Sequence, residues 1–345
     1  MKKFEGKSIL VTGACGTIGT ELVNQLLTDS AYAPRELVCI DNNESAVFYL
    51  DQRYLGDSRA HFYVTDIRDR DALTELMRGV DIVFHAAALK HVILSERSPE
   101  QAVQTNICGV QNIIAAANAN GVETVIFTSS DKAVNPTNVM GTSKLMGERL
   151  ITAANSNKRR GGPVFASTRF GNVLGSNGSV VPIFHKQIAQ GGPVTLTDRA
   201  MTRFVMSIQE SVRLVLDSAE MARGGEVFVT KMPTVRIEDL ALAMIEELAP
   251  RYQRDPGQIE IVEIGVKAGE KLYEELMNSE ETRRTVELQD YFSVLPAFRG
   301  VALNIDYSYP NTVSTTVDKP YVSSEEVPLS KEEIKQFLRV NGLLD

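Results

Sequence analysis

The sequence predicts an α/β protein in which helices cover both faces of a doubly wound parallel sheet, with a smaller mixed α/β lobe toward the carboxyl end. Two observations carry this prediction. Over roughly the first 170 residues, short continuous apolar runs alternate with segments of helical periodicity, which is typical of parallel strands buried on both faces. In addition, the first apolar run ends in closely spaced glycines that open the first helical segment.

The elements follow in order along the chain. The apolar runs that we expect to form strands span residues 8–12, 36–41, 61–66, 80–85, 124–129, 164–169 and 226–230. The segments that we expect to form helices span residues 17–27, 46–54, 69–77, 98–120, 141–155, 207–221, 237–248 and 331–339. After the strand at 164–169 the spacing becomes irregular, with turns at residues 175–178 and 191–193.

These elements divide the chain into three parts. Residues 1–170, joined by roughly 205–232, are expected to form a nucleotide-binding domain of the Rossmann type. Residues 171–204 and 233–305 are expected to form a substrate-binding lobe. Residues 306–345 are expected to be a polar tail that ends in a short amphipathic helix.

Charge and composition exclude several classes of function. The chain has 345 residues and a net charge of −8, which disfavours nucleic-acid and anionic-membrane partners. It has neither a run of about 20 apolar residues nor the apolar core of a signal peptide, so a cytoplasmic location is predicted. The absence of H-E-x-x-H and C-x-x-C patterns gives no reason to expect a metal.

The glycines after the first strand predict a cofactor site. They stand at Gly13, Gly16 and Gly19, and the loop residues between them that we include in the site are Cys15, Thr17 and Ile18. Glycines at such positions permit a tight turn, approach of a pyrophosphate to the backbone, and close packing of helix on strand. The helix N-terminus then offers free N–H groups to the phosphates.

Residues at the ends of the next strands extend this site. Asp41 ends the second strand, where a carboxylate accepts both hydroxyls of an adenosine ribose and repels a 2′-phosphate. Since Asn42 and the two residues after it include no cation, NAD is favoured over NADP. The adenine and the rest of the cofactor are expected to lie along Asp66, Ile67, Ala86, Ala87 and Ala88.

Polar groups also gather after the fifth predicted strand, at the sheet edge where ligands bind in such folds. Ser130, Asp131 and Lys132 place a hydroxyl, a carboxylate and an ammonium together there. Met140 and Lys144 follow at the start of the next helix, four residues apart and therefore on one face.

Several of these motifs together resemble a known family. The glycine triplet, Asp41, His85-Ala-Ala-Ala, the Ser130 to Lys144 spacing and Arg169-Phe-Gly-Asn-Val resemble the extended short-chain dehydrogenase/reductases that act on nucleotide sugars. Within them, four runs are similar to the UDP-N-acetylglucosamine 4,6-dehydratases of bacterial surface-glycan pathways: Ala87-Ala-Leu-Lys-His-Val92, Asp131-Lys-Ala-Val-Asn-Pro136, Gly175-Ser-Asn-Gly-Ser-Val-Val-Pro182 and Met201-Thr-Arg-Phe204.

The resemblance implies roles for the residues after the fifth strand. Lys132 would be the base at C5 of the sugar, Asp131 the acid for the C6 leaving oxygen, and Ser130 a hydrogen-bond partner of the C4 oxygen. Lys144 would hold the nicotinamide ribose. Met140 stands where most of the superfamily has tyrosine, and a thioether cannot act as an acid or base. Our hypothesis is that the C4 hydroxyl proton leaves through Asp131, or through water and Ser130.

The resemblance also assigns contacts to the UDP-sugar. Asn172 would meet the sugar or the diphosphate, Arg203 would meet the diphosphate with a forked contact, and Lys90 would reach the substrate. Glu270 would hold the uridine ribose. The helices at 98–120 and 141–155 are the usual dimer-forming pair of this superfamily, so a homo-oligomer is expected.

Three alternatives stay open at this point. A nucleotide-sugar 4-epimerase shares the oxidation at C4 but needs no acid/base pair for elimination across C5 and C6. A non-catalytic NAD-binding relative would keep the cofactor fold after losing the tyrosine. Within the dehydratase reading, reprotonation of C5 on the same face or on the opposite face is not decided by the sequence.

Overall fold

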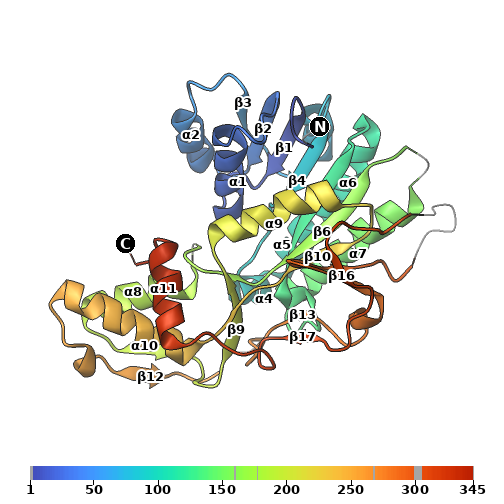
Figure 1. Cartoon of the computed structure of the whole chain (residues 1–345). Helices are drawn as coiled ribbons and strands as arrows, with labels where there is room; N and C mark the ends of the chain where they lie inside the picture. Colours follow the sequence, from blue (N-terminus) through green and yellow to red (C-terminus); the bar gives the residue numbers. More distant parts are fainter. Residues whose placement is uncertain (1–2, 159–160, 177, 267–268, 299–304, 345) are drawn as a thin grey trace.

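One sheet organises most of the computed structural model, which describes residues 3–158, 161–176, 178–266, 269–298 and 305–344. Among these residues its ten strands lie in the order β16-β14-β15-β10-β6-β5-β4-β1-β2-β3. Helices flank the sheet, and a smaller lobe carrying α8, α10 and α11 lies beside it (Figure 1). The α/β class predicted from the sequence is confirmed.

The parallel part of the sheet has the strand order of a Rossmann fold. The chain begins in the middle with β1, runs outward to β3, and then crosses to the other side of β1 with β4. This reversal puts a ligand-binding crevice at the carboxyl ends of β1 and β4. The parallel strands are β1 (Ser8–Thr12), β2 (Glu36–Asp41), β3 (Ala60–Val64), β4 (Ile82–His85), β5 (Thr124–Ser130), β6 (Val164–Phe170) and β10 (Val227–Thr230).

Successive residues of a strand point to opposite faces of the sheet. The side chains of each strand therefore pack alternately into two separate hydrophobic cores. Ile9 and Val11 pack beneath one helical layer, whereas Leu10 packs beneath the other. The first layer contains α1 (Thr17–Thr28) and α9 (Ile208–Met221). The second contains α3 (Arg70–Leu76), α6 (Gly109–Asn120) and α7 (Val139–Asn157), while α2 (Glu44–Arg53) packs beside β2 and β3.

The predicted division of the chain differs from the structure at its carboxyl end. β15 (Tyr291–Val294) pairs antiparallel with β10, and β14 (Thr285–Leu288) pairs with β15. β16 (Thr312–Ser314) then pairs with β14. These strands therefore extend the main sheet, although the sequence analysis placed them in the lobe and the tail.

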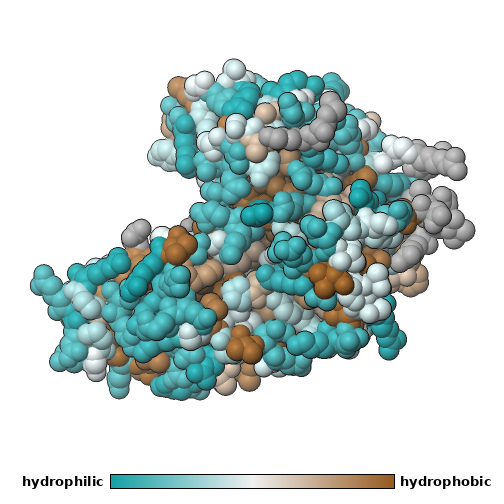
Figure 2. Space-filling view, viewed as in Figure 1, coloured by the Kyte–Doolittle hydropathy of each residue, from teal (hydrophilic) through white to brown (hydrophobic). Residues whose placement is uncertain are grey.

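The lobe has its own hydrophobic core between α8 (Val180–Gln190), α10 (Ile237–Leu248) and α11 (Lys331–Val340). Figure 2 shows a notch between this lobe and the sheet domain. The sequence analysis did not predict α8, in which Pro182 occupies the first turn, where proline is tolerated. The strands outside the main sheet are β7 (Asn172–Val173), β8 (Val194–Leu196), β9 (Thr202–Met206), β11 (Thr234–Arg236), β12 (Ile261–Glu263), β13 (Glu275–Met277) and β17 (Tyr321–Val322).

The helix predicted over 98–120 is not uniform. It begins as α5 (Pro99–Ala102), widens into a π-helix at Val103–Cys108 and continues as α6. A short α4 (Val92–Arg97) precedes it and was not predicted. Short 3₁₀ turns stand at Asp131–Ala133, Ala249–Tyr252, Pro256–Gln258 and Glu281–Arg284. None of the helices in the described ranges is both long and apolar enough to cross a membrane.

Candidate active site at the carboxyl ends of the strands

The glycine loop between β1 and α1 is shaped by three different constraints. Gly13 has a φ of +66°, and a Cβ there would lie 2.6 Å from the Ala87 nitrogen. A Cβ on Gly19 would lie 2.1 Å from the Gly13 oxygen, so this glycine lets helix and strand pack closely. Gly16 is the N-cap of α1, where a Cβ would meet only the Gly13 oxygen, at 3.3 Å. The backbone at Gly16 is therefore the open part of the loop.

Asp41 lies directly against this loop. Its Oδ2 accepts a hydrogen bond from the Cys15 backbone at 3.1 Å, and its Oδ1 accepts one from the Asn43 backbone at 3.0 Å. Burial, with Asp41 nearby, raises the pKa of the Cys15 thiol to about 11, so Cys15 is a neutral packing residue. Thr17 and Ile18 form the first turn of α1 beside them.

The predicted adenine side contains a charge pair. Asp66 accepts hydrogen bonds from the Arg68 backbone and guanidinium, and these, together with Asn42, hold the pKa of its carboxyl below the usual range. The sequence analysis found no cation directly after Asp41. The fold nevertheless brings Arg68 to the predicted adenine side, where its guanidinium forms an ion pair with Asp66. Ile67 is buried against Gly109 of α6.

The segment after β4 forms the floor between the two predicted subsites. The Ala86 backbone donates to the Thr12 carbonyl, the Ala87 backbone donates to the Thr12 hydroxyl, and Ala88 is half-buried. Asn106, inside the π-helix, then binds both the N–H and the C=O of Leu89. This buried amide was missed from the sequence. It fixes the loop from which the exposed Lys90 projects.

Ser130, Asp131 and Lys132 meet in the 3₁₀ turn that follows β5. Asp131 is only 1% exposed, and its Oδ1 accepts hydrogen bonds from the Ser130 hydroxyl at 2.6 Å and from the Lys132 backbone at 2.8 Å. The Lys132 ammonium donates to the same oxygen at 3.1 Å. One oxygen of Asp131 thus accepts three hydrogen bonds, while the Lys132 side chain, 26% exposed, is the member of the group that reaches outward.

Residues of the lobe complete this group. The Asn172 Oδ1 of β7 accepts from the Lys132 ammonium at 3.4 Å, so two residues chosen from distant parts of the sequence come together. Glu274, which the sequence analysis did not select, places its Oε1 3.2 Å from the same ammonium. Burial lowers the pKa of Lys132, but Asp131 and Glu274 outweigh burial and raise it above its usual value.

Arg203 and Glu270 lie next to one another at the lobe edge of the site. The Arg203 guanidinium is 3.9 Å from Glu270 and 3.7 Å from Glu274, and it donates to the carbonyls of Lys271 and Leu272. It therefore shapes the segment that carries both glutamates. Its predicted contact with a diphosphate stays a prediction.

Three contacts tie the lobe segment to the turn after β5. The Lys271 ammonium donates to the Val134 carbonyl, the Asn135 amide donates to Glu275, and the Asn138 amide donates to the Gly269 carbonyl. These bonds hold the segment that carries Glu274 against the turn after β5. The Glu274 carboxylate therefore stays beside the Lys132 ammonium.

Met140 and Lys144 lie buried on one face of α7, as their spacing predicted. The Lys144 ammonium donates to the Thr128 carbonyl at 2.8 Å and lies 4.8 Å from the centre of the Phe127 ring. Gly141 lets the helix start against the turn, because a Cβ there would lie 2.2 Å from the Lys132 carbonyl oxygen. Burial and the Lys144 charge lower the pKa of His85 to about 3, so His85 is neutral.

The buried Lys144 predicts a pH-dependent stability. Burial lowers its pKa from 10.5 to about 8 in the folded chain, against an opposing effect of Glu148. Between these two pH values the unfolded chain binds more protons, so the free energy of unfolding rises with pH, by on the order of 3 kcal/mol in all. Urea unfolding as a function of pH should show a rise that is larger in the wild type than in Lys144→Met by this amount, because the other titrating groups are common to both proteins. Parallel curves for the two proteins would contradict the shift.

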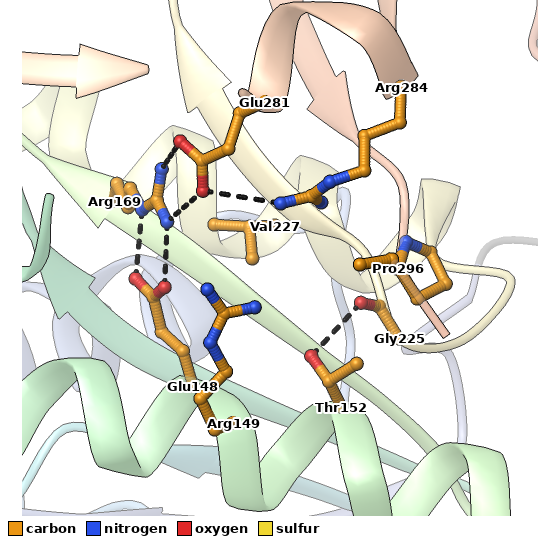
Figure 3. Close-up of a pocket in the computed structure, with 10 residues that line it drawn as sticks. Glu148, Arg149, Thr152, Arg169, Gly225, Val227, Glu281, Arg284 and Pro296 are labelled. Atoms are coloured by element: carbon orange, nitrogen blue, oxygen red, sulfur yellow. Dashed lines mark hydrogen bonds and ion pairs between the residues drawn. The ribbon is translucent and has the colours of Figure 1, made fainter. Parts of the chain in front are cut away.

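Behind the site, Arg169 of β6 is held between two buried carboxylates. Its guanidinium pairs with Glu148 of α7 at 2.8 Å and with Glu281 at 2.7 Å, and it donates to the Leu276 carbonyl of β13. Figure 3 shows this arrangement in a small pocket, with Arg284 also directed at Glu281. The network joins α7, β6 and β13, and its ion pairs include none of Ser130, Asp131 and Lys132.

Comparison with known proteins identifies the family. A model of the family described as polysaccharide biosynthesis protein matches residues 9–296. The chain belongs to this family. Its fold and motifs place it among the extended short-chain dehydrogenase/reductases, as the sequence analysis expected.

Curated relatives cover nearly the whole chain. A protein of Methanocaldococcus jannaschii that is named an uncharacterized membrane protein is 46% identical over 97% of this chain and 96% of its own length. The inverting UDP-N-acetylglucosamine 4,6-dehydratase of Campylobacter jejuni is 38% identical over 88% of this chain and 87% of its own. The UDP-glucose 4-epimerase of Rickettsia massiliae is 37% identical over 97% and 96%.

Solved structures agree in fold. The X-ray structure of Pen from Bacillus thuringiensis has a TM-score of 0.90 and 37% identity, and the alignment covers 99% of both chains. DesIV, a dTDP-glucose 4,6-dehydratase of Streptomyces venezuelae solved with NAD bound, has a TM-score of 0.67 and 25% identity, over 76% of this chain and 86% of its own. Dehydratases and epimerases of nucleotide sugars are therefore both among the relatives.

Proposed function

We propose that this protein is a UDP-N-acetylglucosamine 4,6-dehydratase. The observation that carries the proposal is the buried Asp131, in contact with the outward-reaching Lys132, at the carboxyl end of β5. Elimination of water across C5 and C6 needs a base for the C5 proton and an acid for the C6 oxygen, and a paired amine and carboxyl can supply both. The similarity to the Campylobacter dehydratase supports the choice of sugar.

The geometry favours this reaction over 4-epimerisation. Both reactions begin by removing the C4 hydroxyl proton, which the thioether of Met140, buried on α7, cannot take. An epimerase transfers hydride at C4 alone and needs no acid/base pair for elimination across C5 and C6. The Asp131 and Lys132 pair would have no second task in an epimerase. Because the Rickettsia relative is named a UDP-glucose 4-epimerase, 4-epimerisation is the alternative that an experiment must exclude.

The glycine loop and Asp41 fit an NAD cofactor. Gly16 leaves the helix N-terminus open to a diphosphate, and the Asp41 carboxylate lies at the loop where an adenosine ribose would bind. Lys144 would hold the nicotinamide ribose. NAD, when bound, supplies the hydride acceptor for C4 and the hydride donor for C6, so no net oxidant is consumed. The carboxylate at Asp41 favours NAD over NADP.

The chain's own residues would then move the protons. Asp131, which accepts a hydrogen bond from the Ser130 hydroxyl, takes the C4 hydroxyl proton, directly or through Ser130. The resulting 4-ketone acidifies the C5 proton, which Lys132 removes as a neutral amine. Asp131 passes its proton to the C6 oxygen, which leaves as water. Lys132 returns a proton to C5, and the proton count closes.

The lobe would bind the UDP-sugar. Asn172 lies beside the Lys132 ammonium, at the reacting end. Arg203 and Glu270, next to one another at the lobe edge, would take the diphosphate and the uridine ribose, and Lys90 would reach the substrate from the loop after β4. We also propose a homo-oligomer, because α4, the π-helix and α7 expose Leu94, Val103 and Met146.

Asp131→Asn tests the double role of the carboxyl. The amide keeps the shape but can neither take the C4 proton nor release one to C6, so turnover should fall by about 10²- to 10⁴-fold. The rate of product formation with UDP-N-acetylglucosamine measures this loss. Full turnover of Asp131→Asn would remove Asp131 from both roles.

The proposed activity itself is tested by the mass of the product. Incubation with UDP-N-acetylglucosamine and catalytic NAD should give a nucleotide sugar lighter by one water. A product of unchanged mass with an altered C4 configuration would assign the chain to the epimerases. Tight NAD binding without turnover of any nucleotide sugar would assign it to non-catalytic relatives.

A further inference from the structure

Glu274 has no role in the steps above, yet it is built into the reacting group. Its side chain is 3% exposed, and its Oε1 lies 3.2 Å from the Lys132 ammonium and 3.7 Å from the Arg203 guanidinium. Its other oxygen, Oε2, is buried and has no hydrogen-bond partner among the described residues. A buried carboxylate oxygen without a partner is costly, so this position calls for an explanation.

Hydrogen bonds with Ser323 fix the backbone at Glu274. The Glu274 N–H donates to the Ser323 hydroxyl at 2.9 Å, and the Ser323 N–H donates back to the Glu274 carbonyl. The Ser323 hydroxyl also lies 2.9 Å from the Thr202 hydroxyl of the strand that carries Arg203. A segment near the carboxyl end of the chain therefore holds the glutamate at a defined distance from Lys132.

Lys132 must lose its ammonium proton before it can act as a base, and Glu274 is placed to receive that proton. An amine removes the C5 proton only after it has lost its own proton, and the neighbouring carboxylates keep Lys132 charged. Asp131 is a poor recipient, because its Oδ1 already accepts from the Ser130 hydroxyl and the Lys132 backbone, and its carboxyl is committed to the C4 and C6 oxygens. Glu274 has an oxygen in reach of the ammonium and no task at the substrate.

We propose that Glu274 is the positioning residue that receives the Lys132 proton, so that Lys132 meets the substrate as a neutral amine. The proposal rests on the proposed dehydratase function. In the step, the Lys132 ammonium and the Glu274 carboxylate become an amine and a carboxylic acid. After Lys132 has returned its proton to C5, the acid gives the proton back, and no charge leaves the site.

Electrostatics support this exchange. Burial, with the nearby Asp131, raises the pKa of Glu274 above its usual value, against Lys132 and Arg203, which lower it. The other polar group that faces the ammonium is Asn172 of β7, which does not titrate, and Glu270 faces Arg203. A substrate that excludes water removes the solvation of both charges, and the neutral pair is then favoured.

Glu274→Gln and Glu287→Gln form a matched test. Glu287 of β14 pairs with Lys231 at 2.7 Å, so its substitution removes an ion pair that does not touch Lys132 or the segment that carries Glu274. The first readout needs no turnover: an NMR titration of the Lys132 Cε signal in the free enzyme. Its pKa should fall in Glu274→Gln and stay unchanged in Glu287→Gln. An unchanged pKa in both variants would overturn the proposal.

The second readout is the entry of solvent deuterium into C5. At neutral pH the rate should fall by about 10²-fold in Glu274→Gln and recover as the pH is raised, because the Lys132 proton must then leave to solvent. An equal loss at every pH would show a merely structural role and overturn the proposal, as would a wild-type rate. Glu274→Asp keeps a carboxylate and should retain the wild-type pH profile at a lower rate. If the wild type itself gives no dehydrated product, the proposed function fails, whereas the titration still decides the coupling of Glu274 to Lys132.

Discussion

Lys132→Gln is expected to lower dehydration of UDP-N-acetylglucosamine by about 10²- to 10⁴-fold, the usual contribution of a general base. The amide cannot take the C5 proton, yet it can still donate to Asp131 and Asn172 in the positions that the ammonium holds. Oxidation at C4 should continue, so a reduced cofactor should accumulate without a dehydrated product. Stopped-flow absorbance and product analysis on the same sample measure both steps.

Lys231→Gln is the control for this change. Lys231 pairs with Glu287 of β14 at 2.7 Å, and its side chain is 31% exposed against 26% for Lys132, but its ion pair includes no residue of the reacting group. Its substitution should leave turnover within experimental error of the wild type. Equal losses in the two variants would mean that the effect comes from the fold, and normal turnover of Lys132→Gln would exclude Lys132 as the base.

The second large effect concerns stability. Arg169→Met is expected to lower the free energy of unfolding by about 3–5 kcal/mol, because it leaves the buried carboxylates of Glu148 and Glu281 without their partner. Since Arg169 lowers the pKa of Glu281, the loss should be smaller at acidic pH, where Glu281 is protonated. Equilibrium unfolding in urea as a function of pH measures both effects.

An exposed ion pair provides the comparison. Arg339 of α11 pairs with Glu247 of α10 on the surface of the lobe. Because exposed pairs contribute little, Arg339→Met should leave the unfolding transition almost unchanged. A similar loss of unfolding free energy in Arg169→Met and Arg339→Met would show that the buried ion pairs of Arg169 stabilise the fold no more than an exposed pair does.

The parallel half of the fold was predictable because its signal is local. Each buried strand is a continuous apolar run, and the turn after it carries the glycines, Asp41, or the Ser130 to Lys132 group. Position at the carboxyl end of a strand was enough to select these residues. The structure brings Lys132 and Asn172 together, which neighbouring strands and the turns after them make possible.

The remainder depends on contacts between distant segments. β14, β15 and β16 join the main sheet through antiparallel pairs that no local pattern announces. α8 was hidden by Pro182 and by the glycines on either side of it. Glu274 gains its importance only when the lobe folds back onto the turn after β5, so no spacing rule could have found it.

The most direct test of the account is proton NMR of the purified protein with UDP-N-acetylglucosamine in D₂O, without added reductant. The account predicts a new methyl signal from C6 with deuterium at C5, and the coupling pattern then reports whether C5 has inverted. A product that keeps its C6 hydroxymethyl group, with change only at C4, would contradict the assignment of Asp131 and Lys132 to elimination.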